Sequence, residues 1–252
     1  MALFKSGNPT LSEKTFGEHI QLPGASLETM SIRGTLNKFG IMFLLLLASS
    51  AFTWKAFAEG KNINSWIIGA AIGGLVVALI ITFRPKLSPV LSPIYALVQG
   101  VLVGGISAIY NNAFEAFAPN IVMQAVGITF GVVIAMFALY SSGVLKATKR
   151  FKAVVFTATA GIAVFYLLAF VLRFAGIQMP LIHESTTWGI LFSVVVVVVA
   201  ALNLIMDFDL IEKGAAGGAP KFMEWYGAFA LMVTIIWLYI EILRLLGKLN
   251  KR

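Results

Sequence analysis

The chain has 252 residues, of which 59% are hydrophobic and only 12% are charged, and its formal net charge is +8. A soluble domain has about 25% charged residues, so this chain could not cover a water-facing surface. The absence of cysteine excludes disulfides and thiolate metal sites. We expect no nucleic-acid binding, because the basic residues do not interleave with exposed aromatic residues; they fit loops that face an anionic membrane leaflet instead.

Residues 1–37 are polar and mixed in charge. No apolar stretch lies near Met1, so we expect no cleavable signal peptide. The sequence therefore predicts a polar cytoplasmic tail over residues 1–37, followed by one transmembrane domain over residues 38–252.

Seven apolar runs follow the tail, each comparable to the roughly 20 residues that cross about 30 Å of hydrocarbon. In hydrocarbon only helices and closed barrels satisfy every backbone hydrogen bond, and barrel strands alternate polar with apolar residues. These runs are apolar on every face, so the sequence predicts an all-α bundle of seven transmembrane helices. The expected spans cover residues 39–57, 63–83, 89–110, 119–140, 153–174, 188–208 and 222–246.

Glycines recur at four-residue spacing within three of these spans. That spacing places both glycines on one helix face and lets a second helix approach closely, which we interpret as generic packing in the bilayer. Gln99 and Asn203 are uncharged polar residues inside spans, and we expect each to form hydrogen bonds between helices. The glycine pairs are Gly69 with Gly73, Gly100 with Gly104, and Gly127 with Gly131.

The distribution of basic residues predicts the orientation. With seven spans and a cytoplasmic N-terminus, twelve of the 19 lysines and arginines lie on the inside and seven on the outside, which favours this orientation by the positive-inside rule. The basic C-terminal end opposes it. The inside set is Lys5, Lys14, Arg33, Lys38, Arg84, Lys86, Lys146, Lys149, Arg150, Lys152, Lys213 and Lys221.

Ionisable residues inside a membrane are costly and tend to be functional. Asp207 and Asp209 stand where the sixth apolar run ends, so we expect them near a helix C-terminus. Residues two apart point in widely different directions on a helix, so at most one of them faces a bundle interior. The alternative is that both are solvated loop carboxylates at the membrane interface.

The seventh span contains Thr234 and Glu241, which lie on nearly the same helix face because seven residues make about two turns. Arg244 follows Glu241 by three residues. This spacing predicts an ion pair within the helix, near the outer headgroups.

Enzyme chemistry finds no support in the sequence. The two histidines, His19 and His183, have no partner at metal-ligand spacing, and no serine lies in a nucleophile-elbow pattern. A phosphate-binding Gly-Lys-Ser/Thr loop is also absent from the sequence. We therefore expect no catalytic residue, no metal site and no cofactor.

Three segments resemble one family. The segment IMDFDLIEKG, followed after about ten residues by EWYGAFALMVTIIWLYIEILRLLG, is similar to the C-terminal signature of the Bax inhibitor-1/YccA-like family, the transmembrane Bax-inhibitor-motif proteins. SPVLSPIYALVQGVLVGGIS at 88–107 and NPTLSEKTF in the tail resemble its bacterial branch. The resemblance covers nearly the whole chain and implies a protein of the bacterial inner membrane with the seventh helix central.

The resemblance also implies a pH-sensitive cation leak, chiefly of calcium. In the members that act as channels, an aspartate ending the sixth span and one in the seventh share a proton and close the pore. The first matches Asp207, whereas the position of the second is occupied by Thr234. Two nearby carboxyls can hold a proton between them, and an aspartate with a threonine cannot do so in the same way. Glu241 is the nearest carboxylate of the seventh span, about 10 Å further along the helix.

Two functions of different classes follow. The first is a calcium-permeable leak channel with oxygen ligands suited to a hard cation, whose pathway or gate includes Asp207, Asp209, Thr234, Glu241 and Arg244. The second is a non-conducting regulator that binds other membrane proteins, such as a membrane-embedded AAA protease, with the polar tail as its contact. A secondary transporter is a third, weaker interpretation. The sequence gives no oligomeric state.

Overall fold

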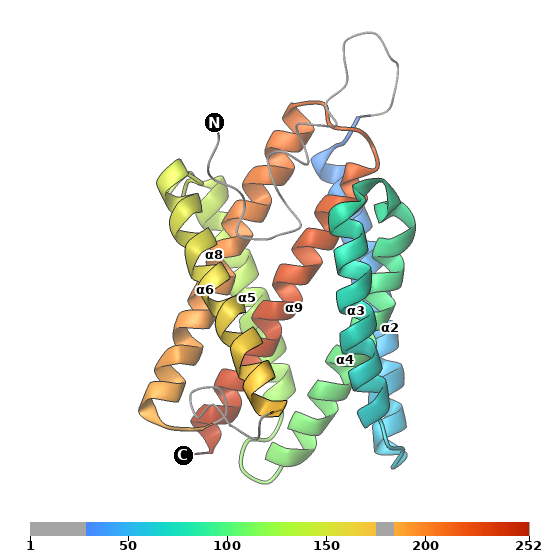
Figure 1. Cartoon of the computed structure of the whole chain (residues 1–252), viewed down its shortest axis with the longest axis vertical. Helices are drawn as coiled ribbons and strands as arrows, with labels where there is room; N and C mark the ends of the chain where they lie inside the picture. Colours follow the sequence, from blue (N-terminus) through green and yellow to red (C-terminus); the bar gives the residue numbers. More distant parts are fainter. Residues whose placement is uncertain (1–28, 175–183, 252) are drawn as a thin grey trace. The chain divides into compact units, whose positions relative to one another are not determined.

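A computed structural model describes residues 29–174 and 184–251. The tail predicted at 1–37 therefore lies mostly outside the described residues. Within these two ranges the structure contains seven helices long and apolar enough to cross a membrane, and no strand, as the sequence predicts. The helices are α2 (Ile32–Ala58), α3 (Asn64–Phe83), α4 (Ser88–Phe114), α5 (Ile121–Ser141), α6 (Lys149–Phe174), α8 (Thr187–Ala216) and α9 (Met223–Asn250) (Figure 1).

Several of these helices extend beyond the apolar runs. The first helix begins at Ile32, within the segment assigned to the tail, because Ser31 caps it: the Ser31 hydroxyl accepts a hydrogen bond of 3.0 Å from the Gly34 amide. The polar first turn of α6 likewise starts at Lys149, ahead of the predicted residue 153. Hydropathy marks where a helix enters lipid, whereas capping residues mark where the helix begins.

Lipid contact explains the surface of the two least buried helices. Only 11% of the most apolar stretch of α6 and 17% of that of α3 are buried within the protein, and the exposed side chains are leucine, isoleucine, valine and phenylalanine. In a bilayer, lipid chains cover such faces, so these apolar side chains are not exposed to water. The corresponding share for α9 is 61%, the largest of the seven described spans. The placement of the seventh helix at the centre of the whole bundle stays a prediction.

The described residues form two compact units that share α4, α8 and α9. The α5–α6 unit consists of residues 110–174, 184–206 and 234–251, and the α2–α3 unit consists of residues 29–109 and 207–233. The chain therefore passes from one unit to the other within α8, between Met206 and Asp207, and within α9, between Val233 and Thr234.

Glycines bring α4 close to two neighbours in the α2–α3 unit. A β-carbon added at Gly100 or Gly104 would overlap α2 at Leu46, Ser49 or the Ser50 backbone, and one added at Gly105 would meet Ile67 of α3 at 2.6 Å. The predicted glycine contact is thus confirmed for this pair. It is wrong for Gly127 with Gly131, where no neighbouring atom lies within 4 Å of the added carbon. It holds only in part for the third pair, since a carbon added at Gly73 would lie 3.8 Å from Val98 of α4 and one added at Gly69 would meet nothing within 4 Å.

Candidate functional site

Asp207 lies inside α8, and its side chain is fully buried. The helix was expected to end near residue 208 but continues to Ala216, so the placement of Asp207 at a helix C-terminus is wrong. The backbone dipole at a helix end therefore does not act on this carboxylate, since that effect is confined to the last turn.

The extension of α8 has a local cause. The Asp209 carboxylate accepts a hydrogen bond of 2.7 Å from the Lys213 ammonium group one turn later, which supports a helix beyond the apolar run. The helix ends at Ala216 and is closed by Gly218, which has a φ of 70°. There the Ala219 amide donates to the Gly214 carbonyl at 3.0 Å and the Gly218 amide donates to the Ala215 carbonyl at 3.3 Å. This pair of bonds is the Schellman motif of a helix C-terminus.

Asp209 is also buried, with 9% of its surface exposed, and its ion pair leads toward solvent because the Lys213 side chain is 56% exposed. The alternative in which both aspartates are solvated loop carboxylates is therefore wrong. The two residues differ nonetheless, because the contact described for Asp209 is with a lysine of its own helix and Asp207 has no exposed surface at all.

Thr234 is buried in α9 with 3% of its surface exposed. It belongs to the α5–α6 unit, whereas Asp207 belongs to the α2–α3 unit. The hypothesis that the two side chains share one cavity thus stays a prediction. Thr234 nonetheless lies at a buried position of α9 and carries a neutral hydroxyl group.

The Glu241–Arg244 pair is confirmed, with 2.9 Å between the Arg244 Nη1 and the nearest Glu241 oxygen. The sequence missed its third member, Tyr166 of α6, whose hydroxyl donates to Glu241 at 2.9 Å and accepts from Arg244 at 2.7 Å. Arg244 also lies over the Tyr166 ring at 5.3 Å. Because Glu241 is 2% exposed, this cluster is a buried contact between helices and not an open headgroup pair.

An apolar layer adjoins this cluster in the α5–α6 unit. Ile162 of α6 packs with Val196 and Val199 of α8, and the partly buried Tyr166 and Trp237 pack against them. One turn further along α8, the Asn203 amide donates to the Thr159 hydroxyl at 2.8 Å, which confirms the expected hydrogen bond between helices.

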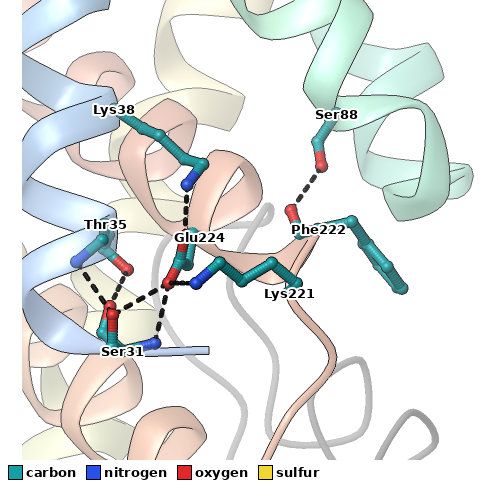
Figure 2. A network of polar contacts seen from close by, with 8 residues as sticks. Ser31, Thr35, Lys38, Ser88, Lys221, Phe222 and Glu224 are labelled. Carbon is teal, nitrogen blue, oxygen red and sulfur yellow. Dashed lines mark hydrogen bonds and ion pairs between the residues drawn. The ribbon is translucent and has the colours of Figure 1, made fainter. Parts of the chain in front are cut away.

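The structure reveals a further buried carboxylate that the sequence did not mark, Glu224 in the first turn of α9 (Figure 2). Its carboxylate accepts hydrogen bonds from the Ser31 amide and the Ser31 hydroxyl, each 2.9 Å long. Lys38 of α2 forms an ion pair with it, and Lys221 forms another at 3.3 Å. Glu224 has no exposed surface, so these groups replace its hydration.

The α4 helix holds the same turn of α9 from another side. The Ser88 hydroxyl donates to the Phe222 carbonyl at 2.9 Å, and the Ser92 hydroxyl donates to the Trp225 carbonyl at 3.3 Å. Tyr95 continues this face of α4 and meets the Phe229 ring edge-on, with 4.8 Å between centroids. The residues of the resembling segment 88–107 thus contact the start of α9.

A signal for the Glu224 cluster was present in the sequence. Lys38 and Glu224 are opposite charges near the starts of the first and seventh apolar runs, and these starts lie on the same membrane side in any seven-span chain. Matching charges between spans of the same direction would have found the pair.

In the described ranges no group of three or more histidine, aspartate or glutamate residues could hold a metal ion.

Comparison with known proteins agrees with the resemblance. No curated protein matches the chain. A family model described as Bax inhibitor 1 like matches residues 8–251, which include every described helix. The chain belongs to the Bax inhibitor 1-like family of multi-pass membrane proteins.

Proposed function

We propose that this protein is a calcium-permeable cation leak channel in which Asp207 is the main functional carboxylate. The observation that supports this function is the complete burial of Asp207 within a membrane-spanning helix. A carboxylate in such a place is costly, and it is retained where it serves an ion or proton pathway. Membership in the Bax inhibitor 1-like family adds support, since the resemblance implies a cation leak.

The ligand chemistry favours a hard divalent cation. Carboxylate, hydroxyl and backbone carbonyl oxygens are the groups that Ca²⁺ binds in proteins. Asp207 supplies a charged oxygen and Thr234 a neutral one. Because threonine does not titrate, the proposed pathway contains a single carboxylate where the resembling channels use a pair. We therefore expect any pH response of the flux to follow one transition, since a coupled pair titrates in two.

The described conformation is a closed one for this function. Asp207 has no exposed surface and Thr234 has 3%, so water does not reach either side chain. Conduction requires an opening that hydrates Asp207 or brings a cation to it. The other named residues have supporting roles: Asp209 with Lys213 holds the extended end of α8, and Glu241 with Arg244 holds α9 to α6.

The proposed location is the bacterial inner membrane, with the N-terminus in the cytoplasm. The support for this orientation is the distribution of basic residues, with twelve of the 19 lysines and arginines on the inner side. Labelling of a cysteine at position 148 in intact cells tests the orientation. Protection from an impermeant reagent is the expected result, and labelling from outside would reverse the orientation.

Calcium flux into liposomes that contain the purified protein tests the function at several pH values. We expect a leak through the wild type and loss of most of that leak, with its pH response, in Asp207→Asn, which removes the charge at constant size. Glu59→Gln is the matched control, because Glu59 lies at the exposed end of α2. A flux profile that Asp207→Asn leaves unchanged would overturn the role of Asp207.

The alternative function is a non-conducting regulator that binds membrane proteins such as a membrane-embedded AAA protease. Its support is the polar segment 1–28 ahead of the first described residues. A protein that folds in liposomes, shows no flux and co-purifies with such a protease only when residues 1–28 are present would establish this function in place of the channel.

A further inference from the structure

The chain just before α2 is attached to the connection between α8 and α9. Thr29 and Pro220 form an isolated antiparallel bridge, and the Met30 amide donates to the Ala219 carbonyl at 2.7 Å. The next residue, Ser31, donates two hydrogen bonds to Glu224, one from its amide and one from its hydroxyl. Three consecutive residues are therefore held by the α8–α9 connection and the first turn of α9.

The fit of α2 against Glu224 is tight. A β-carbon added at Gly34 would overlap all three atoms of the Glu224 carboxyl group, so only glycine permits this approach. The carboxylate also forms ion pairs with two lysines, whose side chains are 19% exposed for Lys38 and 45% exposed for Lys221. The cluster therefore has one negative and two positive charges, and Glu224 is the group that all the other members share.

A short series of contacts leads from Glu224 to Asp207 within the α2–α3 unit. Gly227 follows Glu224 by nearly one turn, and a β-carbon added there would lie 3.2 Å from Thr35 of α2 and 3.2 Å from Ile211 of α8. Ile211 in turn follows Asp207 by four residues on α8. A shift of the first turn of α9 away from α2 would thus loosen the contact of α9 with Ile211, one turn along α8 from Asp207.

We propose that Thr29–Ser31 and Glu224 form a clamp that holds the closed conformation of the protein, with Glu224 as the positioning residue. Release of the clamp separates the first turn of α9 from α2 and lets α8 move at Asp207. This inference rests on the proposed function only where ion flux is measured.

The direction of the effect follows from burial. Asp207 is inaccessible to water while the clamp is formed, so the contacts of the clamp stabilise a conformation that does not conduct. A contact present in only one of two states shifts the population toward that state. Opening the clamp should therefore raise the leak, and locking it should lower the leak.

A cysteine pair tests the clamp without reference to transport. The natural chain has no cysteine, so Thr29→Cys with Pro220→Cys introduces only one possible disulfide. Paired residues of an antiparallel bridge have Cα atoms about 4.5–5.5 Å apart, within the range that disulfides span. Fast crosslinking under mild oxidation is the expected result in the otherwise unchanged protein.

Two variants open the clamp by different means. Glu224→Gln removes the charge, and Gly34→Ala displaces the carboxylate while every charge remains. In each we expect crosslinking about tenfold slower, the effect of losing roughly one charge-assisted hydrogen bond. Gly40→Ala is the matched control, since no neighbour lies within 4 Å of its added carbon. Amide exchange at Met30 and Ser31 should accelerate in the same two variants and not in the control.

Unchanged crosslinking and exchange in both folded variants would overturn the clamp. Calcium flux tests the effect of the clamp on the leak. Oxidation of the cysteine pair should lower the leak about threefold or more, and reduction should restore it. Gly34→Ala should raise the leak by a similar factor. If neither oxidation of the cysteine pair nor Gly34→Ala changes the calcium flux, the clamp does not control the closed state. Absence of any wild-type flux would instead refute the proposed channel, and crosslinking would still decide the clamp.

Discussion

The two compact units hold their helices together by different means. In the α2–α3 unit, glycines at positions 34, 100, 104, 105 and 227 allow close approach, and Glu224 binds groups from distant parts of the sequence. In the α5–α6 unit, Gly127, Gly131 and Gly161 have no neighbour within 4 Å, and the close glycine Gly247 meets the side-chain rings of Tyr110 and Phe114 rather than another backbone. An aliphatic layer and the Tyr166 hydroxyl, bound to Glu241 and Arg244, join α6 to its neighbours there. Close backbone contact makes the first unit sensitive to added volume, whereas the second should tolerate it.

The largest expected effect is at Glu224. Glu224→Gln leaves Lys38 mostly buried without its anion, and we expect a loss of about 3 kcal/mol in the free energy of unfolding, measured in mixed micelles. Lys38→Met added to Glu224→Gln should recover part of that loss, because no buried cation then lacks a partner. The comparison fails if Glu241→Gln, the matched change in the α5–α6 unit, is the more destabilising of the two.

The next largest difference between the two units should come from a methyl group added at a glycine. Gly104→Ala forces the Ser50 backbone of α2 away from α4, and we expect a cost of about 1–3 kcal/mol from overpacking. Gly131→Ala, on an open face of α5, should be neutral or more stable by up to about 1 kcal/mol, since alanine favours the helix. Thermal unfolding of both variants in the same detergent is the measurement. Equal midpoints for the two would contradict the difference in packing.

The smallest expected effect is in the α5–α6 unit. Tyr166→Phe removes the hydroxyl that bridges Glu241 and Arg244 but keeps the ring beneath the guanidinium group. The Glu241–Arg244 pair remains within α9, so we expect a loss of only about 1 kcal/mol in unfolding free energy. A loss as large as that of Glu224→Gln would show that the hydroxyl, and not the apolar layer, holds α6 to α9.

The parts of the fold that the sequence predicted are those set by local pattern. Apolar runs without alternation predict membrane helices, and the three-residue spacing of Glu241 and Arg244 predicts their pair. The end of α8 was missed because hydropathy falls at Asp207, while the helix continues through the Asp209–Lys213 pair to the glycine motif. Spacing alone also does not distinguish a glycine pair that meets another helix from one that faces lipid.

The candidate site was harder to predict for a related reason. Hydropathy singled out Asp207 and the resemblance added the role of Thr234, yet no local pattern gives their burial. Glu224 was missed because its partners Lys38 and Ser31 are 186 and 193 residues away in sequence. A hydrogen bond of that separation leaves no periodic trace, and it emerges only when the topology places the starts of α2 and α9 together.

That separation has a consequence for biosynthesis. At a translation rate of roughly 5–20 residues per second, Glu224 leaves the ribosome about 10–40 s after Lys38, because 186 residues lie between them. During that time α2, α3 and α4 can already assemble through the glycines of α4, while Lys38 lacks its anion and must keep its ammonium group in the headgroup region. The nascent chain thus passes through a long interval in which its first helix is inserted but lacks its contact with Glu224. A chaperone or insertase that binds lysine-bearing spans would act in this interval, and insertion of the last helix would displace it.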